Sequence, residues 1–163
     1  MWKQYQKALS AKDNRERGNL FEEFLRNFFR TIDGFYVLPA PVKTSETDID
    51  IVIANNSTHP FFSKMGPLIT VQAKNYKKSI GWKVVMEAAE QAAAYGPSVK
   101  LVIVATTSKF SKRGKGSIRD IQTRYDITLV VLDKADWEEF FSFEMTPEEF
   151  LYNKILNAPH KLY

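Results

Sequence analysis

Two short segments of the chain alternate between polar and apolar residues as a β-strand does. They are DIDIVIA, residues 48–54, and LITVQAK, residues 68–74. Successive side chains of a strand point to opposite faces, so Gln72 and Lys74 share one face of the second strand. If the two strands pair, Asp50 of the first strand meets them there. The pattern therefore predicts an acid, an amide and an ammonium group side by side in a sheet.

The remaining apolar patterns predict a mixed α/β fold. An aromatic stripe and an alanine-rich stripe, each repeating at helical spacing, predict the two main helices. Runs that are apolar on both faces predict buried strands. The expected elements are helices at about 14–33, 82–95 and 118–125, an edge strand broken by prolines at 35–42, buried strands at 99–108 and 127–133, and helical residues from about 135 with a new helix start at Thr146. This α-β-β-β-α-β-α-β-α order implies a mixed central sheet flanked by helices.

The length of 163 residues suits one domain with one core. We expect that domain at residues 1–142. Residues 143–163 are expected to form a helical tail that packs on it, or else a linker or dimer surface. The connection at 55–67 is long for a hairpin, and we interpret it as decoration of the polar strand ends, with His59 within their reach.

Composition excludes several classes of site. The chain has no cysteine, which excludes disulfides, thiolate zinc sites and cysteine nucleophiles. It has no apolar run of about 18 residues and no signal-peptide core at its start, so we expect a cytoplasmic protein without a membrane partner.

Basic residues gather in the first part of the chain. Residues 133–163 hold seven acids and three bases, whereas residues 1–132 hold 12 acids and 20 bases. The excess is greatest in two clusters: Lys74, Lys77, Lys78 and Lys83, and Lys109, Lys112, Arg113, Lys115 and Arg119. Such clusters suit phosphate groups, although solvated loops account for the charge equally well.

The polar strand residues suit a divalent cation. Hard cations bind oxygen, and Asp50 offers a carboxylate, Gln72 an amide oxygen and Ala73 a main-chain carbonyl. Lys74 cannot bind a cation while charged, but it can hold an attacking water or balance charge on a pentavalent phosphate. Taken singly, each residue has a plainer interpretation: an aspartate at a strand end is usually a turn or capping residue, and such a lysine is usually solvated. Asp48 is the alternative to Asp50.

These segments resemble a known family. IDIVIA followed by VQAK is similar to the signature of the PD-(D/E)xK nucleases, with Ile49 in the usual proline position. Gln72 replaces the usual glutamate, which is characteristic of the Mrr-like branch of restriction endonucleases. Three further segments resemble that branch and extend the likeness over about residues 14–140: GNLFEEFLRNFF, VATTSKFSKRGK and ITLVVLDKADW.

The resemblance implies a restriction-endonuclease-like fold and a catalytic set of Glu22, Asp50, Gln72 and Lys74. Asp50 would bridge the metal, Gln72 would be a second ligand, and Lys74 would be the catalytic ammonium. Glu22 would bind a second metal or a metal-bound water, with Glu23 as its alternative if the helix is rotated. Gln91 lies on the helix that such folds place beside the site, where it either assists or simply belongs to a polar face.

The expected function is a Mg²⁺-dependent endonuclease that hydrolyses DNA and leaves 5′-phosphate and 3′-hydroxyl ends, in a restriction or DNA-defence role. Mn²⁺ is expected to substitute for Mg²⁺. The expected DNA contacts are Lys77, Lys78, Lys109, Lys112, Arg113 and Lys115. The alternatives are a structure-specific nuclease of the Holliday-junction-resolvase type and an inactive nucleic-acid-binding module of the same fold. A homodimer is expected, as is fusion to or association with helicase or methyltransferase parts.

Overall fold

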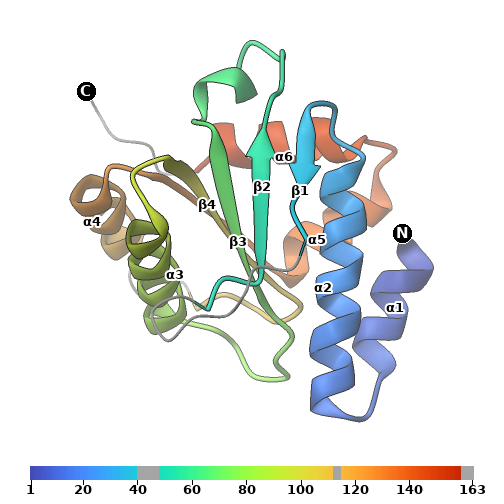
Figure 1. Ribbon diagram of the computed structural model, residues 1–163. Helices are drawn as coiled ribbons and strands as arrows, with labels where there is room; N and C mark the ends of the chain where they lie inside the picture. Colours follow the sequence, from blue (N-terminus) through green and yellow to red (C-terminus); the bar gives the residue numbers. More distant parts are fainter. Residues whose placement is uncertain (40–47, 112–114, 159–163) are drawn as a thin grey trace.

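A five-stranded mixed sheet forms the centre of the molecule (Figure 1). The computed structural model describes residues 1–39, 48–111 and 115–158. The strands lie in the order β1 (Phe35–Val37), β2 (Ile51–Asn55), β3 (Leu68–Lys74), β4 (Val99–Thr106) and β5 (Thr128–Leu132). Strands β1, β2 and β3 pair antiparallel, and β3, β4 and β5 pair parallel. The predicted mixed sheet is confirmed, and its proline-flanked strand does lie at an edge.

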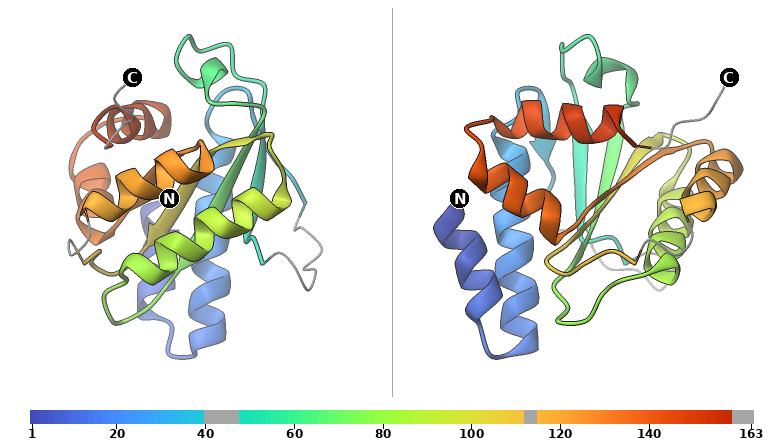
Figure 2. Two further views of the ribbon diagram at one scale, coloured as in Figure 1. Left: turned by 90° about the vertical axis from the view of Figure 1, so that its left-hand side faces the viewer. Right: turned by 180° about the vertical axis from the view of Figure 1, so that it is seen from behind.

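Helices cover both faces of the sheet (Figure 2). On one face lie α1 (Trp2–Ser10), α2 (Asn14–Arg30), α5 (Lys134–Ser142) and α6 (Pro147–Leu156). On the other face lie α3 (Trp82–Tyr95) and α4 (Lys115–Tyr125). None of the helices in these described residues is long and apolar enough to cross a membrane.

The first face holds an aromatic core. Phe21, Phe24 and Phe28 repeat along α2 and are fully buried, as their helical spacing predicts. Trp137 of α5 packs against all three and donates its indole N–H to the carbonyl of Thr106 at 3.1 Å. Helix α2 is therefore held against the sheet along its length.

The predicted helices differ from the observed ones mainly at their ends. Helix α2 stops at Arg30, and Gly34, with φ +79°, lies in the turn that leads into β1. Helix α4 begins at Lys115, three residues before the expected start. Helix α1 occupies residues for which the apolar pattern predicted no element.

The C-terminal helix begins as predicted and shares the main core. Thr146 caps α6 and forms a capping box with Glu149, while Pro147 is the first helical residue. Phe150 packs against Phe28 and Trp137, with ring centroids 5.9 and 5.6 Å apart. The division of the chain at residues 142 and 143 stays a prediction.

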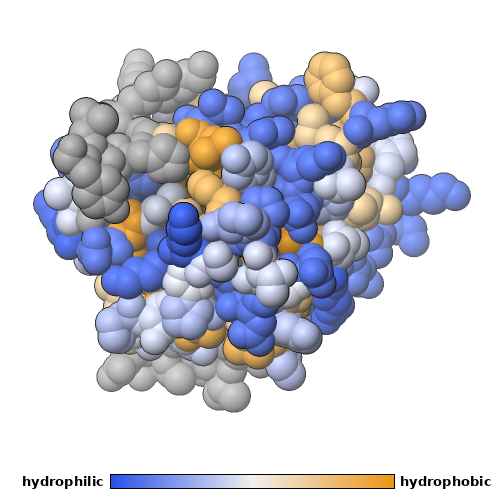
Figure 3. Space-filling view, turned by 90° about the horizontal axis from the view of Figure 1, so that it is seen from above, coloured by the Kyte–Doolittle hydropathy of each residue, from blue (hydrophilic) through white to orange (hydrophobic). Residues whose placement is uncertain are grey.

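The connection between β2 and β3 lies away from the polar strand ends, so its interpretation as decoration of the site is wrong. In an antiparallel pair this connection joins the end of β2 to the start of β3, whereas Asp50 precedes β2 and Lys74 ends β3. The connection contains a 3₁₀ helix, η1 (Phe62–Lys64), and lies at the top of the view in Figure 1. The ring of His59 packs on Phe62 and Tyr152 there. Seen from this end, the surface is mainly hydrophilic, with separate hydrophobic patches (Figure 3).

Candidate active site

Asp50 lies beside the end of β3. Ile51, the first residue of β2, pairs with Val71, so the residue before it reaches the last residues of β3. The carboxylate oxygen Oδ2 of Asp50 accepts a hydrogen bond from the main-chain amide of Ala73 at 2.8 Å. This contact joins the two predicted segments through a side chain.

Gln72 and Lys74 lie on the same face of β3. They pair with Val104 and Thr106 of β4, and Val104 belongs to the core beneath α3 and α4. Gln72 is buried and Lys74 is half-buried. The sheet therefore brings the amide and the ammonium together with Asp50, as the alternation predicted.

Two side-chain amides hold the main chain of Asp48. The Nε2 atom of Gln72 donates to the Asp48 carbonyl at 3.2 Å, and the Oε1 atom of Gln91 accepts from the Asp48 amide. Gln91 of α3 therefore contacts the segment that leads to Asp50. The Asp48 residue itself is exposed, whereas Asp50 is half-buried. Of the two aspartates, Asp50 is the one whose carboxylate bonds to β3.

The surroundings of Asp50 disfavour its negative charge. Burial is the largest cause and raises the pKa of the Asp50 carboxyl above its ordinary value, while the bond from the Ala73 amide lowers it. The nearby charges of Glu22 and Asp48 raise this pKa further, and the ammonium of Lys74 lowers it. The carboxylate is therefore only partly compensated by the protein, as is typical of functional sites.

Glu22 reaches the site as part of an ion pair. Arg26, one turn further along α2, donates to Oε1 of Glu22 from both Nε, at 3.2 Å, and Nη2, at 3.0 Å. Its Nη1 donates to the carbonyl of Leu38 at 3.0 Å, and its Nη2 to the carbonyl of Asp50 at 2.8 Å. Arg26 was not among the predicted site residues, because an acid and a base four residues apart on a helix usually form a surface pair.

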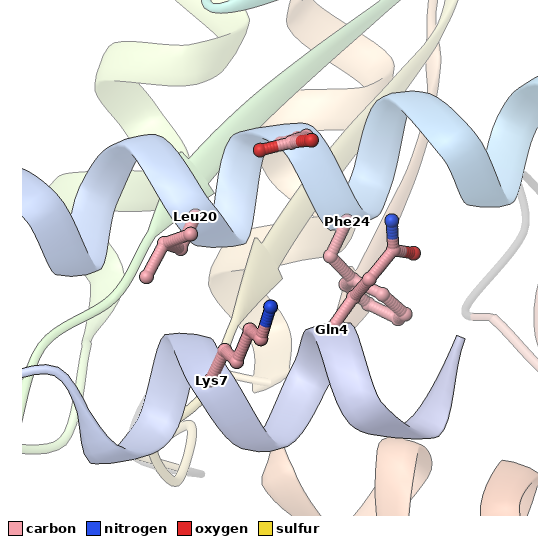
Figure 4. Close-up of a pocket in the computed structure, with 5 residues that line it drawn as sticks. Gln4, Lys7, Leu20 and Phe24 are labelled. Atoms are coloured by element: carbon pink, nitrogen blue, oxygen red, sulfur yellow. The ribbon is translucent and has the colours of Figure 1, made fainter.

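Glu23 faces a different part of the molecule. It lines a small cavity between α1 and α2 together with Gln4, Lys7, Leu20 and Phe24 (Figure 4). The helix is therefore oriented with Glu22, not Glu23, toward the end of the sheet.

Asn75, the residue after Lys74, bonds to the helices α1 and α2 and to the end of β4. Asn75 donates to the carbonyls of Ala8 and Arg17 at 3.0 and 2.7 Å. Its Oδ1 accepts from Arg17 at 3.1 Å and from the hydroxyl of Thr107 at 2.6 Å. The Lys74 ammonium lies 5.9 Å from the centre of the Tyr76 ring. The end of β3 is thus anchored to α1, α2 and the end of β4.

The two basic clusters meet at this end of the sheet. An isolated parallel bridge pairs Ile80 with Phe110, so the segment after β3 lies beside the segment after β4. Lys77, Lys78 and Lys109 are exposed on these two segments. Lys112 and Arg113 lie outside the described residues. Lys115 is the first residue of α4, and its side chain also lies outside the described part.

The donor set at Asp50 fits a hard divalent cation. Asp50 supplies a half-buried carboxylate whose charge the protein compensates only in part. Gln72 donates its amide nitrogen to the carbonyl of Asp48, and the cation would take its amide oxygen. No group of three or more His, Asp or Glu side chains within 1–39, 48–111 and 115–158 is arranged to hold a metal. A cation here would therefore also need amide and main-chain oxygens, which such ions accept.

The chain is similar to a protein family and to solved structures. A family model, Mrr_cat, described as restriction endonuclease, matches residues 14–140. The structure of the restriction endonuclease FokI bound to DNA is similar with a TM-score of 0.50 and 14% identity, over 92% of this chain and 29% of that one. A complex of the restriction endonuclease PspGI with substrate DNA has a TM-score of 0.46 and 15% identity, over 86% of this chain and 56% of that one. The chain thus spans under a third of the first and just over half of the second. None of the curated proteins matches it.

Proposed function

This chain belongs to the restriction endonuclease family, and from that premise we propose that it is a metal-dependent endonuclease that hydrolyses DNA phosphodiester bonds in a restriction or DNA-defence role. One observation carries the proposal: the carboxylate of Asp50 bonds to the amide of Ala73, between the two polar residues of β3. An acid, an amide and an ammonium group on neighbouring positions of two paired strands support metal-assisted hydrolysis of a phosphodiester.

We assign the cation to the carboxylate of Asp50, the amide oxygen of Gln72 and the carbonyl of Ala73, with Glu22 as a further acid at the edge of the site. A bound Mg²⁺, or Mn²⁺ in its place, lowers the pKa of water and neutralises charge on the phosphate. Lys74 has the role of a fixed positive charge that orients the attacking water or stabilises the charge on the phosphate. The expected products carry 5′-phosphate and 3′-hydroxyl ends.

The basic segments after β3 and β4 are the proposed DNA contacts. Lys77, Lys78 and Lys109 are exposed there, and Lys112, Arg113 and Lys115 continue the second segment along the chain. Lysine contacts with phosphates supply affinity and position without reading bases. We therefore expect binding to depend strongly on salt.

Plasmid cleavage tests the assignment directly. Supercoiled plasmid with Mg²⁺ would be incubated with the wild type, Asp50→Ala, Lys74→Ala and Asp48→Ala. Loss of a residue that stabilises the transition state lowers the rate by about 100-fold or more, which we expect for the first two variants. Asp48→Ala tests the alternative aspartate and is expected to retain most of the activity. Equal nicking by the wild type, Asp50→Ala and Lys74→Ala would exclude this site.

A nucleic-acid-binding module without catalysis is the second candidate. Two contacts favour it: Glu22 is already paired with Arg26, and Gln72 already donates to Asp48. Such a module would bind DNA without binding Mn²⁺, so calorimetry with Mn²⁺ alone separates the two candidates. A panel of plain duplex, methylated duplex, single-stranded and four-way-junction DNA separates a restriction role from a junction resolvase.

The assembly of the protein is also a proposal. Cleavage of both strands of a duplex needs two sites, so we propose a homodimer, which gel filtration tests. We further propose that residues 1–142 form the nuclease unit, with residues 143–163 packed on it. The burial of Phe150 and Leu151 in the main core supports that packing. Association with helicase or methyltransferase components would give such a unit its restriction context.

A further inference from the structure

Arg26 is a nearly buried arginine that joins three separate parts of the chain. Only 12% of its side-chain surface is exposed. Its guanidinium bonds to the Glu22 carboxylate on α2, to the Leu38 carbonyl after β1, and to the Asp50 carbonyl before β2. Burying a guanidinium is costly unless its donors are satisfied, and here four hydrogen bonds to groups around the candidate site offset that cost.

We propose that Arg26 is the positioning residue of this site. The single nitrogen Nη2 donates both to Glu22 and to the main chain of Asp50, so it sets the helix acid and the strand acid relative to each other. Both bonds to Glu22 end on Oε1, which leaves Oε2 outside the ion pair. Arg26 therefore holds Glu22 by Oε1, and Oε2 is the oxygen that this proposal assigns to the site. The part of this inference that concerns a cation rests on the proposed function.

A simple helix-surface pair does not account for this geometry. Arg30, one turn further along α2, is such a surface residue: it is exposed and bonds to the side chain of Asn27 at 3.2 Å. Arg26 instead bonds to two main-chain carbonyls 12 and 24 residues away. The planar guanidinium of arginine donates to separate acceptors from several nitrogen atoms in a fixed geometry, whereas a lysine ammonium donates from a single atom.

Hydrogen exchange in the metal-free protein tests the positioning role. The amide of Ala73 is protected by the Asp50 carboxylate, so it reports whether the segment before β2 stays in place. In Arg26→Met we expect its exchange to accelerate by about tenfold relative to the amide of Ile103, a fully buried residue of the interior strand β4 whose amide we expect to open only with the whole fold. If Arg26→Met folds poorly, Arg26→Lys takes its place. It keeps the positive charge without the planar guanidinium, and it should show the same selective acceleration. Arg30→Met is the matched control and should leave the ratio unchanged.

A proportional change at Ala73 and Ile103, or no change at either, would overturn the proposal, because a purely stabilising arginine affects both amides alike. This readout needs neither DNA nor a cation, so its outcome does not depend on the proposed function.

Mn²⁺ calorimetry then tests the link to Glu22. We expect Arg26→Met and Glu22→Gln each to weaken Mn²⁺ binding by about tenfold, and the double variant to bind no more weakly than either single variant, because residues that act as one unit are not additive. Effects that multiply would contradict the coupling of Arg26 to Glu22. If the wild type binds no Mn²⁺ while the exchange result holds, the proposed function fails and the positioning role stands.

Discussion

The carboxylate of Asp50 accepts a hydrogen bond from the main-chain amide of Ala73 at 2.8 Å. This bond crosses from the residue before β2 to the penultimate residue of β3. It places a half-buried acid between Gln72 and Lys74, and it is the contact on which the candidate site depends.

Asp50 should make the metal-free protein less stable as the pH rises. Burial raises the pKa of its carboxyl in the folded state, so between the ordinary and the raised pKa the folded chain binds a proton that the unfolded chain releases. The contribution of the Asp50 carboxyl to the free energy of unfolding therefore decreases as the pH rises between these two pKa values. We expect Asp50→Asn to be more stable than the wild type at neutral pH in EDTA, by urea unfolding. Asp120→Asn, an exposed change on α4, is the control, and an equal gain there would contradict the assignment to burial.

The exposed lysines beside the site should control the salt dependence of DNA binding. The logarithm of the association constant falls as the logarithm of the salt concentration rises, and each phosphate contact that is lost makes this slope shallower by about 0.9. Replacing Lys77, Lys78 and Lys109 by alanine should therefore reduce the magnitude of the slope by about 2–3. Fluorescence anisotropy without divalent cations measures this slope. Lys100→Ala is the control, because Lys100 lies at the start of β4 and pairs with Asp126 at 3.2 Å. If Lys100→Ala makes the slope as shallow as the triple variant does, the DNA does not bind at the two basic segments.

Asn75 should matter for stability out of proportion to its size. Its amide group makes four hydrogen bonds, which connect α1, α2 and the end of β4. Leaving buried partners unsatisfied costs about 1–3 kcal/mol each, so we expect Asn75→Ala to lower the free energy of unfolding by about 3 kcal/mol. Urea unfolding checks this value against Asn153→Ala, an exposed asparagine on α6. A loss below about 1 kcal/mol would show that water replaces these bonds.

Replacement by alanine should change the stability of the protein in opposite directions at Gly34 and at Gly18. Gly34 has φ +79°, and a β-carbon there would lie 2.4 Å from the Cα atom of Ser57. We expect Gly34→Ala to cost about 2–4 kcal/mol from strain and overlap. Gly18 lies inside α2, and a β-carbon there would have no described atom within 4 Å. Gly18→Ala should therefore stabilise the protein by about 1 kcal/mol through helix propensity. Thermal unfolding of the two variants side by side measures both effects.

Local patterns were sufficient to predict much of the fold. The alternation in LITVQAK predicted β3 at Leu68–Lys74, the bounds that the structure shows. Thr146, Pro147 and Glu149 predicted the start of α6, including its capping box. These features depend on residues within a few positions of each other, so the sequence states them directly. Helix α1 was not predicted, although its buried Tyr5 and Ala8 join the main core, because its remaining residues are mainly exposed.

Chain direction decided which end of the sheet carries the polar residues. The sequence showed a long connection between two candidate strands, but it did not show that these strands pair antiparallel. Antiparallel pairing puts Asp50, which precedes the first strand, beside Lys74, which ends the second, and puts the connection at the opposite end of the pair. That geometry separates His59 from the site by the length of the hairpin. The parallel pairing of β3 and β4 brings the segment that holds Lys109 beside the segment that holds Lys77 and Lys78, through the bridge between Ile80 and Phe110.

The sequence by itself determined most of the helices and strands, the faces they bury, and the residue types that suit a divalent cation. Only the tertiary structure decided that the carboxylate of Asp50 bonds to β3, that Arg26 of α2 bonds to the carbonyl of Asp50, and that Gln72 and Gln91 hold the main chain of Asp48. The physical reason is the separation along the chain. Helix and strand periodicity is written in neighbouring residues, whereas these contacts join residues of different elements, and strand register and helix packing decide which of them meet.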